Sequence, residues 1–447
     1  MAAPTERTQP NPVQAGLQPN PVQVDLSLQV GKYEVQKLIS KGATGTVYLA
    51  KDTFSGNEVA LKTIEPEVFR DPEFGTVYRQ QFLNEASLAG KLRHPHIVAI
   101  LDAVMQEHSG YIAMEYVDGH DLSRHTRPGQ LLPIADVLQL GFKCCGALEY
   151  AFKVGGIVHR DIKPANLLLA RGGEVKISDF GAAYLRKSQA VKTAEMGSPY
   201  YMSPEQLQHR ELSFQSDMYS LGVVLYELLT GQRPFTADSL EALRQKIVQI
   251  PPVAPSNLRR DLPKKIDAIL LHALAKTPAQ RYATWSEFAL ALSGVAEKLQ
   301  PPSVIPDSEK YVALKREPTL AGLSDVELWE LARTANWVRV PPLTTIMREN
   351  DKGRKLFYLG KGEARVTRGR QLLNIIREGE CFGEMAYIRE GDAPRSATVT
   401  SVKEMLLAEF EPEALERMST GAQLYLTRAL VRNLADRLEL AITMPGR

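Results

Sequence analysis

Two short segments between residues 159 and 181 constrain this chain more than any other feature of its sequence. The segment His159–Asn166 reads HRDIKPAN, and the segment Asp179–Gly181 reads DFG after a stretch that predicts a short β-hairpin. Charged and amide side chains at these fixed positions, followed by a second fixed triplet, form a far more specific pattern than an accidental charged loop. The two segments therefore predict a site of chemistry.

This pattern resembles the catalytic loop and the metal-binding triplet of the eukaryotic-type (Hanks-type) protein kinase superfamily, in its serine/threonine branch. By that resemblance Asp161 is the catalytic base, and Asn166 and Asp179 hold Mg²⁺ against the phosphates of ATP. Lys163 would stabilise the transferring phosphate. The resemblance implies a bilobal kinase fold that transfers phosphate from ATP to serine or threonine of protein substrates.

A cation for the phosphates is predicted further upstream. The segment Val59–Lys62 reads VALK, and strand alternation places Ala60 and Lys62 on one face. Ala60 would then form a wall for adenine while Lys62 reaches the phosphates. Glu85, in a helix predicted over 82–92, is the residue that the family uses to hold such a lysine, which favours this interpretation over a solvated surface lysine.

Two further segments resemble the nucleotide contacts of the family. The segment Ser40–Val47 reads SKGATGTV and predicts a glycine-rich loop over the phosphates, although Ser40 stands where the family most often has its first glycine. The segment Met114–Val117 resembles the hinge between the lobes, whose backbone would contact adenine. The residues expected to bind ATP are Ile39, Gly42, Gly45, Val47, Ala60, Lys62, Glu115 and Val117.

The stretch between residues 179 and 205 resembles an activation segment, which forms the platform for the protein substrate. Arg160 directly precedes the catalytic base, as in kinases whose segment is ordered by an added phosphate. The candidate phosphorylation residues are Ser188, Thr193 and Ser198. We expect autophosphorylation at Thr193 or Ser188.

Three charged residues outside these motifs are expected to hold the platform and the loop in place. By the resemblance, Glu205 pairs with Arg281 in a buried ion pair at the end of the activation segment. Asp217 would hold the backbone of the catalytic loop. Each of these residues alone would otherwise be an ordinary surface charge.

Near the C-terminus, two segments resemble the phosphate-binding cassette shared by the catabolite activator protein and the regulatory subunit of cyclic-AMP-dependent protein kinase. They are Phe382–Ala386 (FGEMA) and Arg395–Val399 (RSATV). A cyclic phosphate needs a cation and backbone amides at a short helix N-terminus, and the ribose hydroxyl needs a carboxylate. The resemblance implies that cyclic AMP or cyclic GMP regulates the kinase through the residues Gly383, Glu384, Ala386, Arg395 and Ser396.

The sequence leaves alternatives open for both domains. The stretch 387–394 is longer than in the commonest form of the cassette, and Asn350 replaces a frequent turn glycine. Degenerate members of that fold bind nothing, so a silent docking domain is the alternative to a nucleotide sensor. A pseudokinase scaffold is the alternative to an enzyme, although Lys62, Asp161 and Asp179 argue against it. A transcription factor would need a DNA-reading domain after the final helix, and we expect none.

Patterning along the chain predicts an α+β protein. Short strand-like runs with one helix are followed by mainly helical segments, then by proline-spaced polar residues, and finally by a small β-roll closed by a helix. The expected parts are a disordered proline-rich leader (1–30), a protein kinase domain (31–298, with lobes 31–117 and 118–298), a linker (299–320) and a cyclic-nucleotide-binding-like domain (321–447).

Composition excludes several classes of protein. No apolar run approaches the roughly 20 residues that span a bilayer, and no secretory signal is recognisable, so we expect a cytoplasmic protein. With 54 Lys and Arg against 52 Asp and Glu, the net charge of +2 lacks the footprint of nucleic-acid binding. The three cysteines Cys144, Cys145 and Cys381 have neither metal-ligand nor disulfide spacing, which favours buried thiols.

The final helix, predicted over 424–442, carries apolar residues at alternating steps of three and four. This spacing is typical of a seam that could pair two chains into a homodimer, as in the catabolite activator protein. A helix that caps its own barrel is the other interpretation. The residues of the seam are Leu424, Thr427, Val431, Leu434, Leu438 and Ala441.

Overall fold

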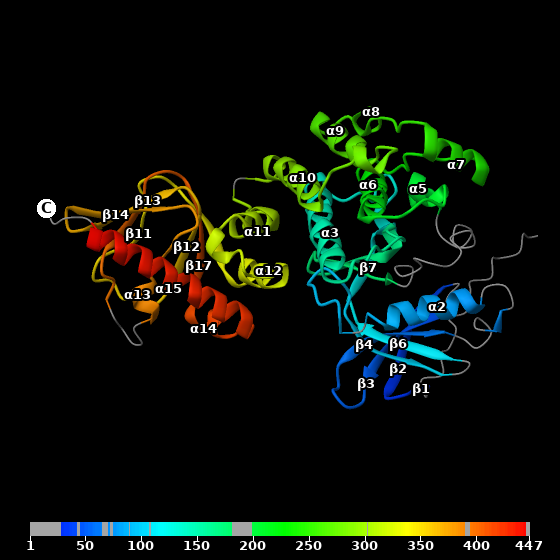
Figure 1. The fold of residues 1–447 in the computed structure, drawn as a ribbon, viewed down its shortest axis with the longest axis horizontal. Coiled ribbons are helices and arrows are strands. Elements are labelled where there is room, and N and C mark those ends of the chain that lie inside the picture. The colour runs from blue at the N-terminus through cyan, green and yellow to red at the C-terminus, as the bar shows by residue number, and fades with distance from the viewer. Residues whose placement is uncertain are drawn as a thin grey trace, which may run out of the picture.

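The computed structural model describes residues 28–42, 45–64, 70–71, 75–88, 90–106, 109–180, 199–301, 303–388 and 394–443. Figure 1 shows a strand-rich N-terminal lobe (blue) beside a helical lobe (cyan to green), with a second strand-rich domain (yellow to red) at the far end. The three candidate phosphorylation residues and nearly all of the predicted leader lie outside the described residues.

The N-terminal lobe is built on a six-stranded antiparallel sheet with the order β1-β2-β3-β4-β6-β5. Its strands are β1 (Gln29–Val30), β2 (Tyr33–Gly42), β3 (Gly45–Asp52), β4 (Glu58–Ile64), β5 (Ile100–Met105) and β6 (Gly110–Glu115). Alternation along β4 buries Val59 and Leu61 in the core of the lobe with Tyr33 and Ala113. Lys62, next along the strand, therefore lies on the other face.

Helix α2 (Gly75–Ala86) packs on this sheet and differs from the expected helix over 82–92. It starts earlier and ends at Ala86, residues 87 and 88 form a turn, and Gly90 has a φ of +71°, a left-handed conformation that favours glycine. Leu88 and Leu92 are nevertheless buried. The apolar spacing that suggested a longer helix thus belongs to a packed turn.

The helical lobe is organised around α6, a mainly apolar helix that is buried throughout most of its length. Ser213 forms a capping box at its start, and Gly231 ends it in a left-handed conformation. The elements of this lobe are β7 (Gly119–Asp121), η1 (Leu122–His125), α3 (Ile134–Gly155), η2 (Pro164–Asn166), β8 (Leu167–Ala170), β9 (Val175–Ile177), η4 (Pro199–Tyr201), α5 (Pro204–Leu207), α6 (Phe214–Thr230), α7 (Leu240–Gln249), α8 (Pro255–Leu258), α9 (Lys264–Ala273), η5 (Pro278–Gln280) and α10 (Trp285–Leu299). The three short strands form the sheet β7-β8-β9.

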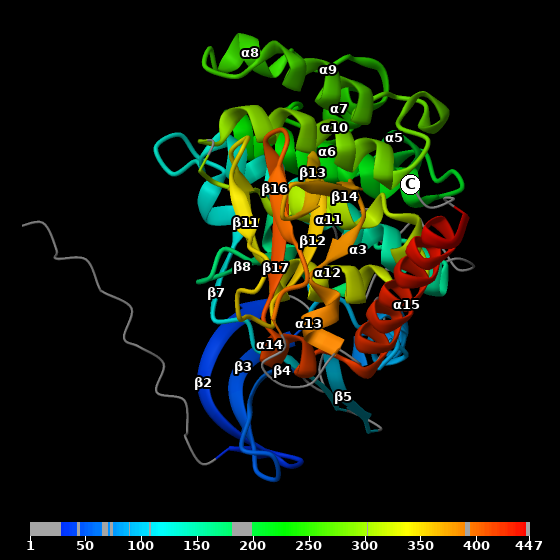
Figure 2. The same cartoon turned by 90° about the vertical axis from the view of Figure 1, so that its left-hand side faces the viewer.

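The C-terminal domain packs two four-stranded antiparallel sheets face to face, in the orders β10-β17-β12-β15 and β11-β16-β13-β14. Its elements are β10 (Asn336–Val340), β11 (Thr345–Met347), β12 (Leu356–Lys361), β13 (Glu363–Arg368), β14 (Gln371–Arg377), β15 (Cys381–Phe382), α13 (Glu384–Ile388), β16 (Thr398–Ser401), β17 (Met405–Phe410), α14 (Pro412–Glu416) and α15 (Thr420–Thr443). Figure 2 shows these strands face on, with α15 running along their side. This arrangement confirms the predicted β-roll with a final helix.

The predicted linker over 299–320 is more structured than its prolines suggested. It contains helix α11 (Asp307–Lys315) and the turn η6 (Pro318–Leu320), and helix α12 (Asp325–Thr334) follows. Pro306 stands directly before α11, where proline starts a helix rather than breaking one, and Asp307 favours the N-terminal turn. Tyr311 and Leu314 of α11 are buried in one apolar core that extends from α3 into β12 and α15.

Helix α15 bears on the two interpretations of the final helix. Its residues Leu426 and Leu430 are buried against its own domain, as expected of a cap. Leu424 and Val431 of the predicted seam are 49% and 59% exposed on another face. The helix therefore caps its domain and also leaves an apolar stripe uncovered.

Two expectations from composition can be compared with the structure. The thiols of Cys144, Cys145 and Cys381 are buried and unbridged, which confirms the prediction for the cysteines. Within the described ranges no helix combines the length and the apolar character needed to cross a membrane.

Candidate functional site

The N-terminal lobe presents Lys62 to two carboxylates. Lys62 Nζ donates to Glu85 Oε2 at 2.9 Å and to Asp179 Oδ1 at 2.6 Å, so strand β4, helix α2 and the segment after β9 meet at one amine. Burial by itself lowers the pKa of Lys62, but the charges of Asp179 and Glu85 outweigh burial and raise that pKa. The amine in turn lowers the pKa of Asp179. The predicted pairing of Lys62 with Glu85 is confirmed.

The catalytic loop holds Asp161 between two donors. Lys163 Nζ lies 2.7 Å from Asp161 Oδ2, and Asn166 Nδ2 donates to the carbonyl and to Oδ2 of Asp161 at 2.8 Å and 3.1 Å. The backbone N–H of Ser178 donates to the carbonyl of Asn166 at 2.9 Å, which ties the loop to the segment that carries Asp179. Carboxylate and amide oxygens beside a cation suit Mg²⁺ and the phosphates that it accompanies.

The backbone just before Asp161 is strained, and a buried carboxylate accepts hydrogen bonds from it. Arg160 has a φ of +70°, a left-handed conformation that non-glycine residues rarely adopt. Asp217, at the start of α6, accepts from the backbone N–H groups of His159 and Arg160 at 2.6 Å and 2.7 Å. Burial raises the pKa of Asp217, although these N–H groups and nearby charges oppose the shift. The predicted support of the loop by Asp217 is confirmed.

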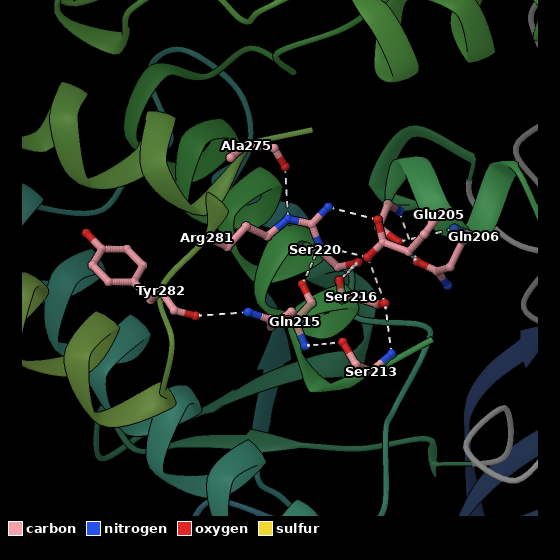
Figure 3. Close-up of polar contacts among 10 residues, drawn as sticks. Glu205, Gln206, Ser213, Gln215, Ser216, Ser220, Ala275, Arg281 and Tyr282 are labelled. Carbon is pink, nitrogen blue, oxygen red and sulfur yellow. Dashed lines mark hydrogen bonds and ion pairs between the residues drawn. The ribbon is translucent and has the colours of Figure 1, made fainter. Parts of the chain in front are cut away.

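A buried ion pair fixes the segment that follows the activation segment (Figure 3). Arg281 donates from Nη1 and Nη2 to the two carboxylate oxygens of Glu205 at 2.7 Å and 2.8 Å. Its Nε donates to the carbonyl of Ala275 at 2.9 Å, and its Nη1 donates to the carbonyl of Gln215 at 2.6 Å. Ser216 Oγ also donates to Glu205 at 2.8 Å. Burial alone raises the pKa of Glu205, but Arg281 outweighs burial and the pKa is lowered. The predicted pair is confirmed.

The strands beside Lys62 bring together several residues that the sequence predicts to contact the nucleotide. Val47 on β3 pairs with Lys62 on β4, and Ala60 pairs with Met114 on β6, so these residues line neighbouring positions of one sheet. Gly45 has a φ of +150°, and a Cβ there would lie 2.2 Å from the carbonyl oxygen of Thr63. Only glycine fits that approach of two strands. Gly42 pairs with Gly45 across the hairpin, while residues 43 and 44 lie outside the described ranges.

The hinge contains an ion pair that sequence reasoning missed. Lys176 on β9 lies 2.9 Å from Glu115 Oε1, and the other carboxylate oxygen of Glu115 accepts from Ala99 N at 3.3 Å. The side chain of Glu115 is therefore occupied, and its backbone N–H donates to the carbonyl of Ala99 at 2.8 Å. Val117 follows in the hinge, and Ile39 is 45% exposed on β2. Alternation along β9 could have identified Lys176, because it stands on the opposite face from the buried residues 175 and 177.

The candidate cyclic-nucleotide residues surround a buried guanidinium. Arg395 is 5% exposed, and its Nη1 and Nη2 donate to the carbonyls of Gly383 and Lys355 at 3.0 Å and 2.9 Å. Its guanidinium carbon lies 5.6 Å from the ring centroid of Phe357. Burial lowers the pKa of Arg395, and the buried carboxylate of Glu384 opposes that shift. Sequence reasoning missed Lys355 and Phe357, since neither belongs to the cassette.

The turn before helix α13 leaves room for the guanidinium of Arg395 because it contains a glycine. Gly383 has a φ of +80°, and a Cβ there would lie 2.7 Å from Arg395 Nη1. Helix α13 begins at Glu384 and includes Ala386, and Ser396 follows the buried arginine. A buried cation, a neighbouring carboxylate and a helix start fit a cyclic phosphate with its ribose. The residues 389–393 of the long stretch lie outside the described ranges.

Comparison with known proteins matches both parts of the chain. The protein kinase domain family matches residues 33–290, and the cyclic nucleotide-binding domain family matches residues 337–420. The serine/threonine-protein kinase PknB of Mycolicibacterium smegmatis is 37% identical over 299 residues, which are 64% of this chain and 47% of PknB. The serine/threonine-protein kinase PksC of Streptomyces coelicolor is 35% identical over 297 residues, 63% of this chain and 52% of PksC. The chain thus spans about half the length of these relatives.

Proposed function

The chain belongs to the protein kinase family and carries a cyclic nucleotide-binding domain, and on this premise we propose that it is a serine/threonine protein kinase that phosphorylates protein substrates and itself. We propose further that its C-terminal domain binds cyclic AMP or cyclic GMP and thereby regulates the kinase. One observation carries the first proposal: Lys62 bonds to Glu85 and Asp179 together, while the loop of Asp161 is tied to the same segment.

The residues of the site divide the chemistry among them. Asp161, oriented by Lys163 and Asn166, accepts the proton of the substrate hydroxyl at a carboxylate oxygen. Asn166 and Asp179 would hold Mg²⁺, which supplies positive charge against the phosphates of ATP. Lys62 orients the phosphates because Glu85 fixes its amine. When ATP is bound, Lys163 Nζ would turn from Asp161 toward the transferring phosphate and offset the negative charge that develops there.

Phosphate transfer from radiolabelled ATP to a generic protein substrate tests this proposal. Asp161→Asn in the full chain should lower kcat by at least about 100-fold, the range of general base catalysis. Glu58→Gln, an exposed carboxylate at the start of β4, is the matched control and should leave the rate unchanged. A wild type without activity would support the pseudokinase alternative instead, and an active wild type with an unaffected Asp161→Asn variant would exclude Asp161 as the base.

Support for cyclic-nucleotide binding comes from the buried guanidinium of Arg395 beside the start of α13. Isothermal titration of the full chain with cyclic AMP and with cyclic GMP should show binding that Arg395→Gln removes. Arg370→Gln, an exposed arginine at the turn between β13 and β14, is the control and should bind like wild type. Absence of heat with both nucleotides would leave the C-terminal domain as a silent docking module.

A further inference from the structure

Helix α12 packs against the helical lobe of the kinase domain through an aromatic side chain. Trp329 is 2% exposed, and its ring meets that of His96 edge on, with centroids 4.9 Å apart. The same ring stacks on Tyr311 of α11 at 4.6 Å and lies 6.2 Å from Phe142 of α3. Burial of so large a ring by two separate domains is a strong apolar contact. We therefore infer that the contact contributes to the stability of the folded chain.

His96 connects this contact to the strand that leads into the active site. Its Nδ1 lies 2.9 Å from the carbonyl of Val175 and must donate, so Nε2 is left to accept from Arg333 Nη2 at 3.4 Å. Burial holds the pKa of His96 well below its ordinary value, which keeps this neutral form. The carbonyl of His96 also accepts from Ile177 N at 2.9 Å. Ile177 ends β9, and Asp179 lies two residues later.

A row of alternating charges surrounds the aromatic contact. Arg333 lies 2.9 Å from Glu174, Glu174 lies 3.2 Å from Lys143, and Lys143 lies 2.8 Å from Asp307. Lys143 is a buried residue of α3, so its charge would be costly without these two carboxylates. Burial raises the pKa of Asp307, but Lys143 and Lys310 outweigh it and set the pKa to about 2. The kinase domain and helices α11 and α12 thus complement each other in charge as well as in shape.

Another residue of α12 contacts the helix that leads to the candidate nucleotide site. The carboxylate of Glu330 accepts from the backbone N and the Oγ of Ser419 at 2.7 Å and 2.6 Å, just before α15. Farther along α15, Asn433 Nδ2 donates to the carbonyl of Cys381 at 3.4 Å. Cys381 begins the strand that runs into Gly383, whose carbonyl accepts from the buried arginine. Helix α12 therefore lies between the two sites and contacts elements of both.

From these contacts we propose that the surface formed by His96, Lys143 and Glu174 is the docking surface for α12, and that this docking positions β9 and Asp179 for catalysis. Arg333 and Trp329 are then positioning residues of the kinase reaction. The inference rests in part on the proposed function, because a nucleotide bound near α15 would act on the kinase by moving α12. Docking of α12 in the absence of nucleotide does not depend on that part of the proposal.

The first experiment tests docking in the full chain without nucleotide. In Arg333→Gln and in Trp329→Ala, kcat should fall about fivefold or more, the lower end of measured couplings, while KM for the protein substrate is unchanged. Amide hydrogen exchange over 175–180 should become faster by a similar factor. Arg370→Gln is the control, and Trp329→Phe, which keeps an aromatic ring, should recover most of the loss. Exchange and kcat at the level of wild type in both variants would overturn the proposal.

The second experiment adds cyclic nucleotide and separates the two proposals. If wild type binds nucleotide and changes its rate, Arg333→Gln should bind nucleotide equally well in titration calorimetry yet lose most of that change in rate. A full response in Arg333→Gln would overturn the coupling role of α12. If wild type binds no nucleotide, the sensor proposal fails, while the first experiment still decides whether α12 positions β9.

Discussion

Removing either partner of the buried pair of Glu205 and Arg281 should strongly lower the free energy of unfolding of the helical lobe. The side chains are 4% and 0% exposed, so removal of one partner leaves a charge or its acceptors without water. Such a loss costs about 3–5 kcal/mol of the free energy of unfolding. Arg281→Met lies at the upper end, because the carbonyls of Ala275 and Gln215 also lose a donor. Glu205→Gln lies at the lower end, since its amide oxygen still accepts from Arg281.

The double variant Glu205→Leu with Arg281→Met makes the reasoning sharper. It removes both charges and leaves the two carbonyls as the main loss, so its cost should be smaller than the summed costs of the single variants Glu205→Leu and Arg281→Met by about 2 kcal/mol or more. Calorimetric melting of the full chain, with the transition of the helical lobe assigned by amide hydrogen exchange, measures these differences. Single variants within about 1 kcal/mol of wild type, or costs that simply add, would refute the assignment of a coupled buried pair.

Four other predictions concern separate parts of the chain. His94 is held neutral because burial lowers its pKa from 6.5 to about 3. Its unfolded form therefore takes up a proton that the folded form refuses, and the contribution of His94 to the free energy of unfolding should fall by about 1.4 kcal/mol per pH unit as pH drops below about 6.5. Denaturant titrations of wild type and His94→Gln check this, and equal slopes with pH would contradict it. Gly383→Ala should weaken cyclic-nucleotide binding at least about tenfold in calorimetry, because the added Cβ would push the guanidinium of Arg395 out of place. A tenfold loss of affinity corresponds to about 1.4 kcal/mol of binding free energy. Unaltered affinity would argue against nucleotide binding beside Gly383 and Arg395. Val431→Glu should abolish a homodimer formed through α15, as judged by sedimentation, and a wild type that sediments as a monomer at every concentration would exclude that dimer. Mass spectrometry of the active enzyme should find phosphate on Thr193 or Ser188, whereas an unmodified segment with undiminished turnover would exclude autophosphorylation there.

The candidate active site was predictable because the proposed chemistry requires particular residue types at particular spacings. The pairing of Lys62 with Glu85, and the support of the loop by Asp217, both followed from motifs that the structure brings together. Helix α11 was not predictable in the same way. Prolines at 301, 302 and 306 are typical of an extended linker, and only tertiary packing of Tyr311 and Leu314 distinguishes a helix start from a helix break.

The contact between Trp329 and His96 lies beyond what sequence patterns can indicate. The two residues are far apart in the chain, and neither belongs to a periodic run whose partner is implied by spacing. Amphipathic patterning predicts that a helix buries one face, but not which surface covers it. The same holds for Lys176, whose position on a strand face was readable while its partner Glu115 was not.

The single apolar core that runs from α3 through α11 and α12 into the C-terminal domain limits how such a chain could arise or be rebuilt by recombination. A chimera joined near residue 300 to an unrelated kinase would carry Tyr311 and Trp329 without the Phe142 face that receives them. Those rings would meet water, and the fusion would aggregate or need new partners. A functional transplant would have to include the recipient surface of α3, so the exchangeable unit is larger than either domain alone.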